Sequence, residues 1–133
     1  MKSFKDYIKE DKVCFEMSNI KKNITNLPVN IWIDDAGKPR NDEMQHNEIR
    51  MKFQNNTDNY LDSDELIPVK IDENNPKILL KDGEYELGIK LRDLKSIYNF
   101  IKYWYKELIE VYEQKLDIDD FKEKLRNSGK KKY

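Results

Sequence analysis

The spacing of the apolar residues changes abruptly at Leu91. From Glu48 to Phe53, charged and apolar residues alternate one by one, which is the period of a strand with one buried face. From Leu91 to Leu116, large apolar residues recur every three or four positions, which is typical of a helix of roughly six turns. Strands followed by a long helix favour an α+β domain. We expect a four- to six-stranded, mainly antiparallel sheet packed on one face by a long C-terminal helix at about 92–115.

Other segments predict the remaining strands. Residues 13–17 alternate and indicate a first strand, and Val29–Ile33 is apolar enough for a central strand. Residues 67–71 alternate again, and Pro68 within them indicates a sheet edge or a strand end. Residues 78–89 predict a hairpin that turns at Asp82-Gly83.

The helix signals set the limits of the domain. Ser3 can cap a short N-terminal helix, and Asp117 can cap a final helix that ends at Asn127-Ser128-Gly129. A chain of 133 residues can bury a sizeable core without disulfides or metals. We expect a single α+β domain over 1–126, followed by a basic flexible tail over 127–133.

Composition narrows the class of function. The formal net charge is −1, although 38% of the residues are charged, and this balance denies a general attraction to phosphate backbones. Cys14 is the only cysteine, which suits a reducing compartment. The first twelve residues lack the apolar core of a signal peptide, and no apolar run reaches membrane length, so we expect neither a signal peptide nor a membrane span. We expect a cytoplasmic protein of a bacterial host cell, with no membrane partner; the sequence predicts no particular oligomeric state.

The sequence contains few residues that could form a catalytic site. His46 is the only histidine, so a nucleophilic mechanism or a zinc site would depend on it and on Cys14, too few groups for either. A magnesium-dependent nuclease is the better enzyme candidate, with Asp34 or Asp35 at one strand end and Glu48 on the next strand. Arg50 then stands where such nucleases need lysine, and arginine replaces it badly. We expect no enzyme, no cofactor and no metal.

Two kinds of binding remain. A nucleic-acid-binding regulator would use Arg40, Arg50, Lys52, Lys21 and Lys22, although nearby acidic residues offset part of their charge. Protein binding is favoured by the large aromatics of the predicted helix, which exceed what one buried stripe needs. Phe100 and Tyr103 fall off that stripe, and tyrosine is common at interfaces because it joins a large area to a polar tip.

Several stretches carry a resemblance to known sequences. These are EMSN (16–19), LPVNIWIDDAGKPRN (27–41), HNEIRMKFQNN (46–56) and NPKIL (75–79), together with the closing helix. Together they resemble a loosely defined family of small uncharacterised proteins carried by phages and other mobile elements of low-GC bacteria. The resemblance implies no established activity. It favours accessory phage roles, such as binding a host or defence protein or regulating phage genes.

These observations lead to one main hypothesis. We expect a non-enzymatic phage or mobile-element accessory protein that binds a host or defence-system protein and inhibits or redirects it. The alternative is a nucleic-acid-binding regulator or, less favoured, the magnesium-dependent nuclease. We predict partner-binding residues in three places. On the hairpin that leads into the strand at 48–53 they are Arg40, His46, Arg50 and Lys52. On an acidic loop that could mimic nucleic acid they are Asp58, Asp62, Asp64 and Glu65, and on the helix Tyr103.

Overall fold

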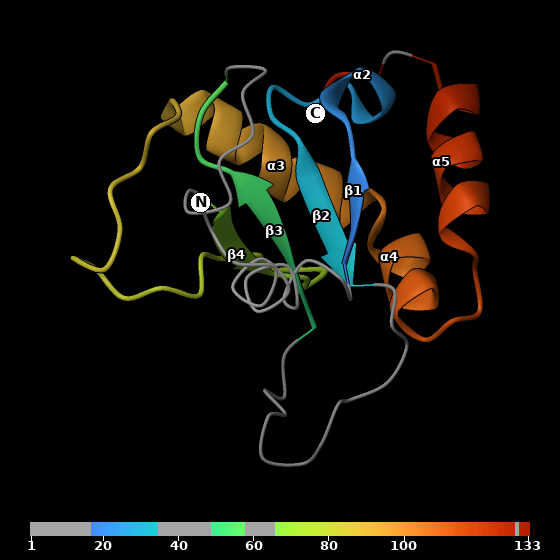
Figure 1. The fold of residues 1–133 in the computed structure, drawn as a ribbon, viewed down its shortest axis with the longest axis horizontal. Coiled ribbons are helices and arrows are strands. Elements are labelled where there is room, and N and C mark those ends of the chain that lie inside the picture. Colours follow the sequence, from blue (N-terminus) through green and yellow to red (C-terminus); the bar gives the residue numbers. More distant parts are fainter. Residues whose placement is uncertain (1–16, 35–48, 58–65, 130) are drawn as a thin grey trace, which may run out of the picture.

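The computed structural model describes residues 17–34, 49–57, 66–129 and 131–133. Its elements, in chain order, are β1 (Met17–Ile20), α2 (Lys22–Thr25), β2 (Ile31–Asp34), β3 (Arg50–Gln54), β4 (Leu66–Lys70), α3 (Leu91–Tyr103), α4 (Tyr105–Tyr112) and α5 (Ile118–Asn127). The four described strands form one antiparallel sheet in the order β1-β2-β3-β4. In Figure 1 α3 crosses behind this sheet, while α4 and α5 lie beyond the β1 edge. The predicted α+β fold is confirmed.

The core lies between the sheet and the helices. The strand register places buried residues opposite one another on the face that α3 covers, which we call the inner face. Apolar side chains of α3, α4 and α5 complete this core. Its fully buried members include Ile20, Ile31, Phe53, Ile33, Met51, Val69, Ile97, Phe100, Ile101, Leu108 and Phe121.

Strand β3 follows the alternation that its sequence predicts. Met51 and Phe53 are completely buried in the core, and Ile49, just before the strand, packs against them. Arg50 and Lys52 alternate with these residues and are half-buried on the other side. This burial pattern confirms the prediction for the strand. It arises because successive side chains of a strand point to opposite faces of the sheet.

Strand β4 lies at the edge of the sheet, as Pro68 indicates. The Ile71 N–H donates to the Ile49 carbonyl on the β3 side, while the Pro68 carbonyl accepts from the Leu79 N–H on the other side. The nitrogen of Pro68, which has no hydrogen to donate, therefore points away from β3. An edge strand tolerates proline for this reason.

The hairpin predicted over 78–89 is wrong. Only Ile78 forms a bridge, to Val69, and residues 79–90 form no strand. The turn itself is present: the Glu84 N–H donates to the Lys81 carbonyl at 3.0 Å, and Gly83 has a φ of +89°. Glycine suits that position because it adopts positive φ without steric cost.

Asn55 explains why the second arm of this hairpin does not form. Its Oδ1 accepts from the Gly88 N–H at 2.7 Å, and its Nδ2 donates to the Glu86 carbonyl at 2.7 Å. The backbone of 86–88 thus bonds to a side chain that follows β3, rather than to residues 78–80. These bonds lead the chain to Ile89, which is buried, and to the start of α3.

The long helix predicted at about 92–115 is two helices with a break at Trp104. The Trp104 N–H still donates to the Phe100 carbonyl, and its own carbonyl accepts from the Leu108 N–H. Its backbone, at φ −99° and ψ 17°, leaves the helical geometry. Its indole packs edge-to-face on Phe121 of α5, with ring centroids 5.8 Å apart. The break therefore occurs where a large aromatic residue is buried against a third helix.

The last helix matches its predicted signals. Asp117 is the N-cap of α5, and its carboxylate accepts from the Asp119 N–H at 3.2 Å. Phe121 and Leu125 are buried on one face, and the helix ends before Gly129, which has a φ of +77°. Both ends thus follow the expected capping rules.

The predictions for the N-terminal segment lie mostly outside the described residues, whereas the last three residues of the C-terminal segment are described. The predicted helix at Ser3 and the first part of the strand predicted at 13–17 lie outside the described residues, and β1 continues that strand from Met17 to Ile20. The tail predicted to be flexible makes defined contacts in its last three residues. The Asn26 Nδ2 donates to the Lys131 carbonyl at 2.8 Å, and Tyr133 packs against α3.

Candidate functional site

The sheet face opposite α3, which we call the outer face, gathers a tryptophan and several bases. The register aligns Asn19, Trp32, Lys52 and Pro68 in one row across all four strands. In the next row Arg50 lies opposite Lys70. Directly opposite residues in an antiparallel pair lie side by side on the same face. Trp32 and Lys52 are therefore neighbours, with Arg50 and Lys70 beside them.

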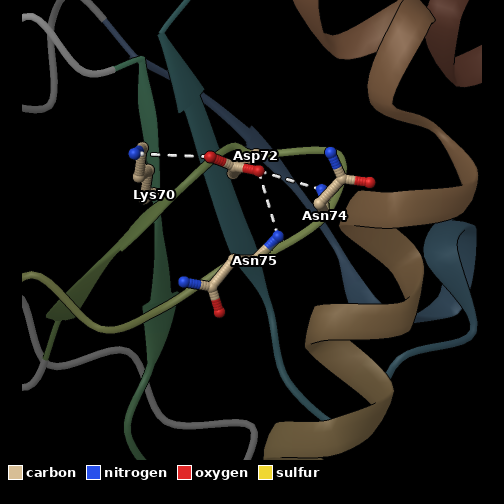
Figure 2. A network of polar contacts seen from close by, with 4 residues as sticks. All are labelled: Lys70, Asp72, Asn74 and Asn75. Carbon is tan, nitrogen blue, oxygen red and sulfur yellow. Dashed lines mark hydrogen bonds and ion pairs between the residues drawn. The ribbon is translucent and has the colours of Figure 1, made fainter.

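Lys70 forms an ion pair with Asp72, which lies in the turn that follows β4 (Figure 2). Its Nζ lies 3.3 Å from the Asp72 carboxylate. The same carboxylate accepts from the backbone N–H groups of Asn74 and Asn75, at 2.9 and 3.0 Å. These two N–H groups, more than the lysine, lower the pKa of Asp72. Asp72 therefore offsets part of the positive charge that Lys70 brings to the outer face.

A buried polar network closes one end of the outer face. The Asn30 Nδ2 donates to the Gln54 Oε1 at 2.9 Å, and the Gln54 Nε2 donates to the Asn56 Oδ1 at 2.8 Å. The Asn30 Oδ1 accepts from the Lys22 N–H at 2.8 Å. Gln54 is completely buried, so these bonds replace the water that its amide loses. Satisfied networks of this kind hold neighbouring strands in one arrangement.

A second cluster lies on the helical layer, around Tyr103. This residue is 56% exposed, and its ring packs edge-to-face on Trp104 with centroids 5.1 Å apart. The Lys131 Nζ lies 4.4 Å from its ring centroid, a cation–π distance, and contact with Tyr103 raises the pKa of Lys131. The Trp104 Nε1 donates to the Tyr133 hydroxyl oxygen at 2.8 Å. Burial raises the pKa of the Tyr133 phenol.

The structure separates the predicted contact residues. Arg50 and Lys52 lie together on the outer face, as predicted. Tyr103 is exposed as predicted, but it lies on the helical layer, on the other side of the molecule from that face. The remaining predicted contacts lie outside the described residues: Arg40, His46, Asp58, Asp62, Asp64 and Glu65.

Two aromatic residues lie in surroundings that differ from those predicted. Phe100 belongs to the core, completely buried, rather than to a surplus of interface aromatics. Trp32 belongs to the segment predicted as a central strand, and it is half-buried on the outer face rather than fully buried. Its signal was present in the alternation Ile31-Trp32-Ile33, in which the two isoleucines are buried and the tryptophan is not.

The nuclease arrangement is only partly visible. Asp34 is the last residue of β2, and Arg50 begins β3. Asp35, Glu48 and the Asp34 side chain lie outside the described residues. The two described strands are adjacent and antiparallel, and Ile33 lies opposite Met51.

Neither a metal site nor a membrane span is found among the described residues. Within the described ranges, no three His, Cys, Asp or Glu side chains form a group that could hold a metal ion. None of the helices in those ranges is both long enough and apolar enough to cross a membrane. Comparison with protein-family models, curated proteins and solved structures finds no match.

Proposed function

We propose that the protein is a non-enzymatic accessory protein of a phage or mobile element, which binds a host or defence-system protein and inhibits or redirects it. The outer face of the sheet is the proposed contact surface. The observation that carries this proposal is the alignment of Trp32 with Lys52, beside Arg50, on the face opposite α3. The resemblance to phage and mobile-element sequences supports the biological setting.

The residue types on the outer face support protein binding. Tryptophan and arginine are enriched among the few residues that dominate the energy of protein interfaces. Trp32 is half-buried, so it keeps area for a partner while the strand holds its position. Lysine and arginine beside it favour a partner whose matching surface is acidic, because complementary charge speeds association and sets orientation.

The support beneath this surface lowers the entropy that binding would lose. The outer-face residues stand on paired strands whose opposite side is completely buried. The Asn30–Gln54 bond fixes β2 relative to β3 at one end of the face. A side chain held on a rigid strand loses less freedom on binding than one on an open loop, and more of its contact energy remains as affinity.

Affinity capture from a lysate of the native bacterial host tests the proposal. The wild-type chain should recover one protein in a stoichiometric amount. The double variant Arg50→Glu/Lys52→Glu should lose it, because it reverses two positive charges beside Trp32 on the outer face. The matched control is Lys124→Glu/Arg126→Glu on α5, which makes the same change of charge at exposed positions far from the outer face.

The outcomes separate the alternatives. Equal recovery of the partner by wild type and by the Arg50→Glu/Lys52→Glu variant would show that the outer face is not the contact surface. Loss of the partner from the α5 control as well would point to overall charge instead. If wild type retained only nucleic acid, and the outer-face variant released it, the nucleic-acid-binding alternative would replace this proposal.

A further inference from the structure

The solvent side of α3 carries a continuous row of bases. Arg92, Lys95 and Lys102 are exposed on α3, and Lys106 is exposed at the start of α4. The spacings of three and seven residues keep the three bases of α3 on one side of a helix with 3.6 residues per turn, and Lys106 follows beyond the break at Trp104. The opposite side of α3, with Ile97, Phe100 and Ile101, is buried against the sheet. We call these four bases the α3 basic row.

Acidic residues are scarce along the α3 part of this row, whereas Glu107 and Glu110 follow Lys106 on α4. Asp93 is the only acidic residue of α3, and its side chain is 18% exposed. One of its carboxylate oxygens lies 4.0 Å from the Arg92 Nε, so it offsets part of a single charge at one end. Between the bases the helix presents Ser96 and Asn99, which are uncharged. The helix therefore presents a positive surface although the chain as a whole has a net charge of −1.

The C-terminal segment adds charge beside the middle of the row. Tyr103, which follows Lys102, lies under the Lys131 ammonium group. Lys132 next to it is exposed. The Asn26–Lys131 and Trp104–Tyr133 hydrogen bonds hold this segment against the helices. Two further cations therefore lie near the row in a defined position.

From this arrangement we propose that the α3 basic row binds the phosphate backbone of duplex DNA. This surface is distinct from the outer face, and the inference does not depend on the proposed protein partner. At 1.5 Å per residue, the three bases of α3 extend over roughly 15 Å. That length of duplex carries about nine phosphates. Asparagine and tyrosine along the row are also common donors to phosphate oxygens, whereas the Ser96 hydroxyl already donates to the Arg92 carbonyl at 3.1 Å.

The structure favours duplex DNA over the other polyanions. A membrane-surface helix inserts its apolar face among the lipids, but the apolar face of α3 is buried in the core. Single strands are bound on platforms of stacked aromatics, and Tyr103 is the only exposed aromatic beside this row among the described residues. The major groove of B-form DNA admits a helix, whereas the deep, narrow groove of A-form RNA does not.

Fluorescence anisotropy with a labelled 20-base-pair DNA duplex tests the inference. Four phosphate contacts should give a slope of about −3.6 for log K against log salt, so binding should weaken about 100-fold between 50 and 200 mM NaCl. The variant Lys95→Glu/Lys102→Glu should lose at least about tenfold in affinity at 50 mM, and its slope should fall by about 2. Both positions are exposed, and circular dichroism should show unchanged folding.

The controls make each outcome decisive. Lys124→Glu/Arg126→Glu on α5 should bind DNA almost as wild type does, and Arg50→Glu/Lys52→Glu should also keep most of the affinity. Equal losses in all three variants would overturn the assignment to α3, as would the absence of salt-dependent binding at 50 mM NaCl. Stronger retention on phosphatidylserine vesicles, single-stranded DNA or duplex RNA than on duplex DNA would also overturn it. Loss of DNA binding with the protein partner still captured would leave the outer-face proposal intact.

Discussion

Gly88 is the position where the smallest substitution should have a large effect. A Cβ built there would collide with the main-chain carbonyl oxygen of Asn55 and would lie 3.4 Å from its side-chain oxygen. The collision is with the backbone, so a change of side-chain rotamer cannot relieve it. Gly88→Ala must therefore push the 86–88 segment away from the end of β3.

The magnitude follows from what this movement breaks. Two hydrogen bonds of 2.7 Å join Asn55 to the Glu86 carbonyl and the Gly88 N–H. Each contributes about 1 kcal/mol net, and forcing packed backbone apart costs about 1–3 kcal/mol. Alanine restricts the unfolded chain and returns about 0.4–1 kcal/mol. We expect a net loss near 3 kcal/mol, or about 11 °C in Tm for a domain of this size.

Urea unfolding followed by circular dichroism measures this loss directly. Gly83→Ala is the comparison, because a Cβ there meets nothing within 4 Å and only the positive φ is strained. It should lose about 1 kcal/mol. The sharper control adds Gly88→Ala to an Asn55→Ala background. Since the colliding oxygen belongs to the main chain, the glycine substitution should still destabilise that background. A Gly88→Ala protein as stable as wild type would refute the close approach of 86–88 to Asn55.

Substitutions at three further positions test contacts described above. Tyr133→Phe removes the acceptor of the Trp104 indole N–H, which should lower the unfolding free energy by about 1–2 kcal/mol in urea; an unchanged stability would show that this contact does not hold the C-terminal segment. Asp117→Ala should lower the thermal stability by about 1 kcal/mol through loss of the α5 cap, whereas Asp117→Asn should retain most of it. The pKa of Asp72 is lowered in the folded protein, so its stabilising effect is present above its ordinary pKa and disappears as pH falls through the lowered value. Asp72→Asn should remove that acid-range change from the pH dependence of stability, and a carboxyl titration by NMR should place the pKa of Asp72 below the ordinary value.

Local patterns predicted the half-buried strands and the last helix well. In β3, Met51 and Phe53 are buried while Arg50 and Lys52 are only half-buried, so alternation alone separated the two pairs. In α5, a cap at Asp117 and a stop near Gly129 are encoded within a few residues of the ends they define. Such features depend on the backbone nearby and need no knowledge of distant contacts.

The failures depend on contacts between distant residues. The apolar period runs through Trp104 without interruption, so nothing local marks the break between α3 and α4. That break accompanies packing on Phe121, seventeen positions further along the chain. The hairpin was predicted from good local alternation, but Asn55 bonds to the backbone that would have formed its second arm. Propensity is a weak guide where a tertiary partner competes.

The candidate site was predicted only in part for the same reason. Sequence alternation assigned Arg50 and Lys52 to a common face. The neighbouring position of Trp32 depends on how β2 and β3 are aligned, which alternation within one strand does not specify. The α3 basic row was visible in the spacing of its bases, but a row at helical spacing is meaningful only once the opposite side of the helix is known to be buried.

The proline of β4 has a consequence for the behaviour of the protein at high concentration. An edge strand with free N–H and C=O groups can template the pairing of another molecule, the first step of sheet-to-sheet aggregation. On the outward side of β4, Pro68 has no hydrogen to offer, and its carbonyl is already bonded to Leu79. Lys70 and Lys77 form the next bond along this edge. A foreign strand would find few partners here, so β4 acts as a gatekeeper against intermolecular β-sheet growth.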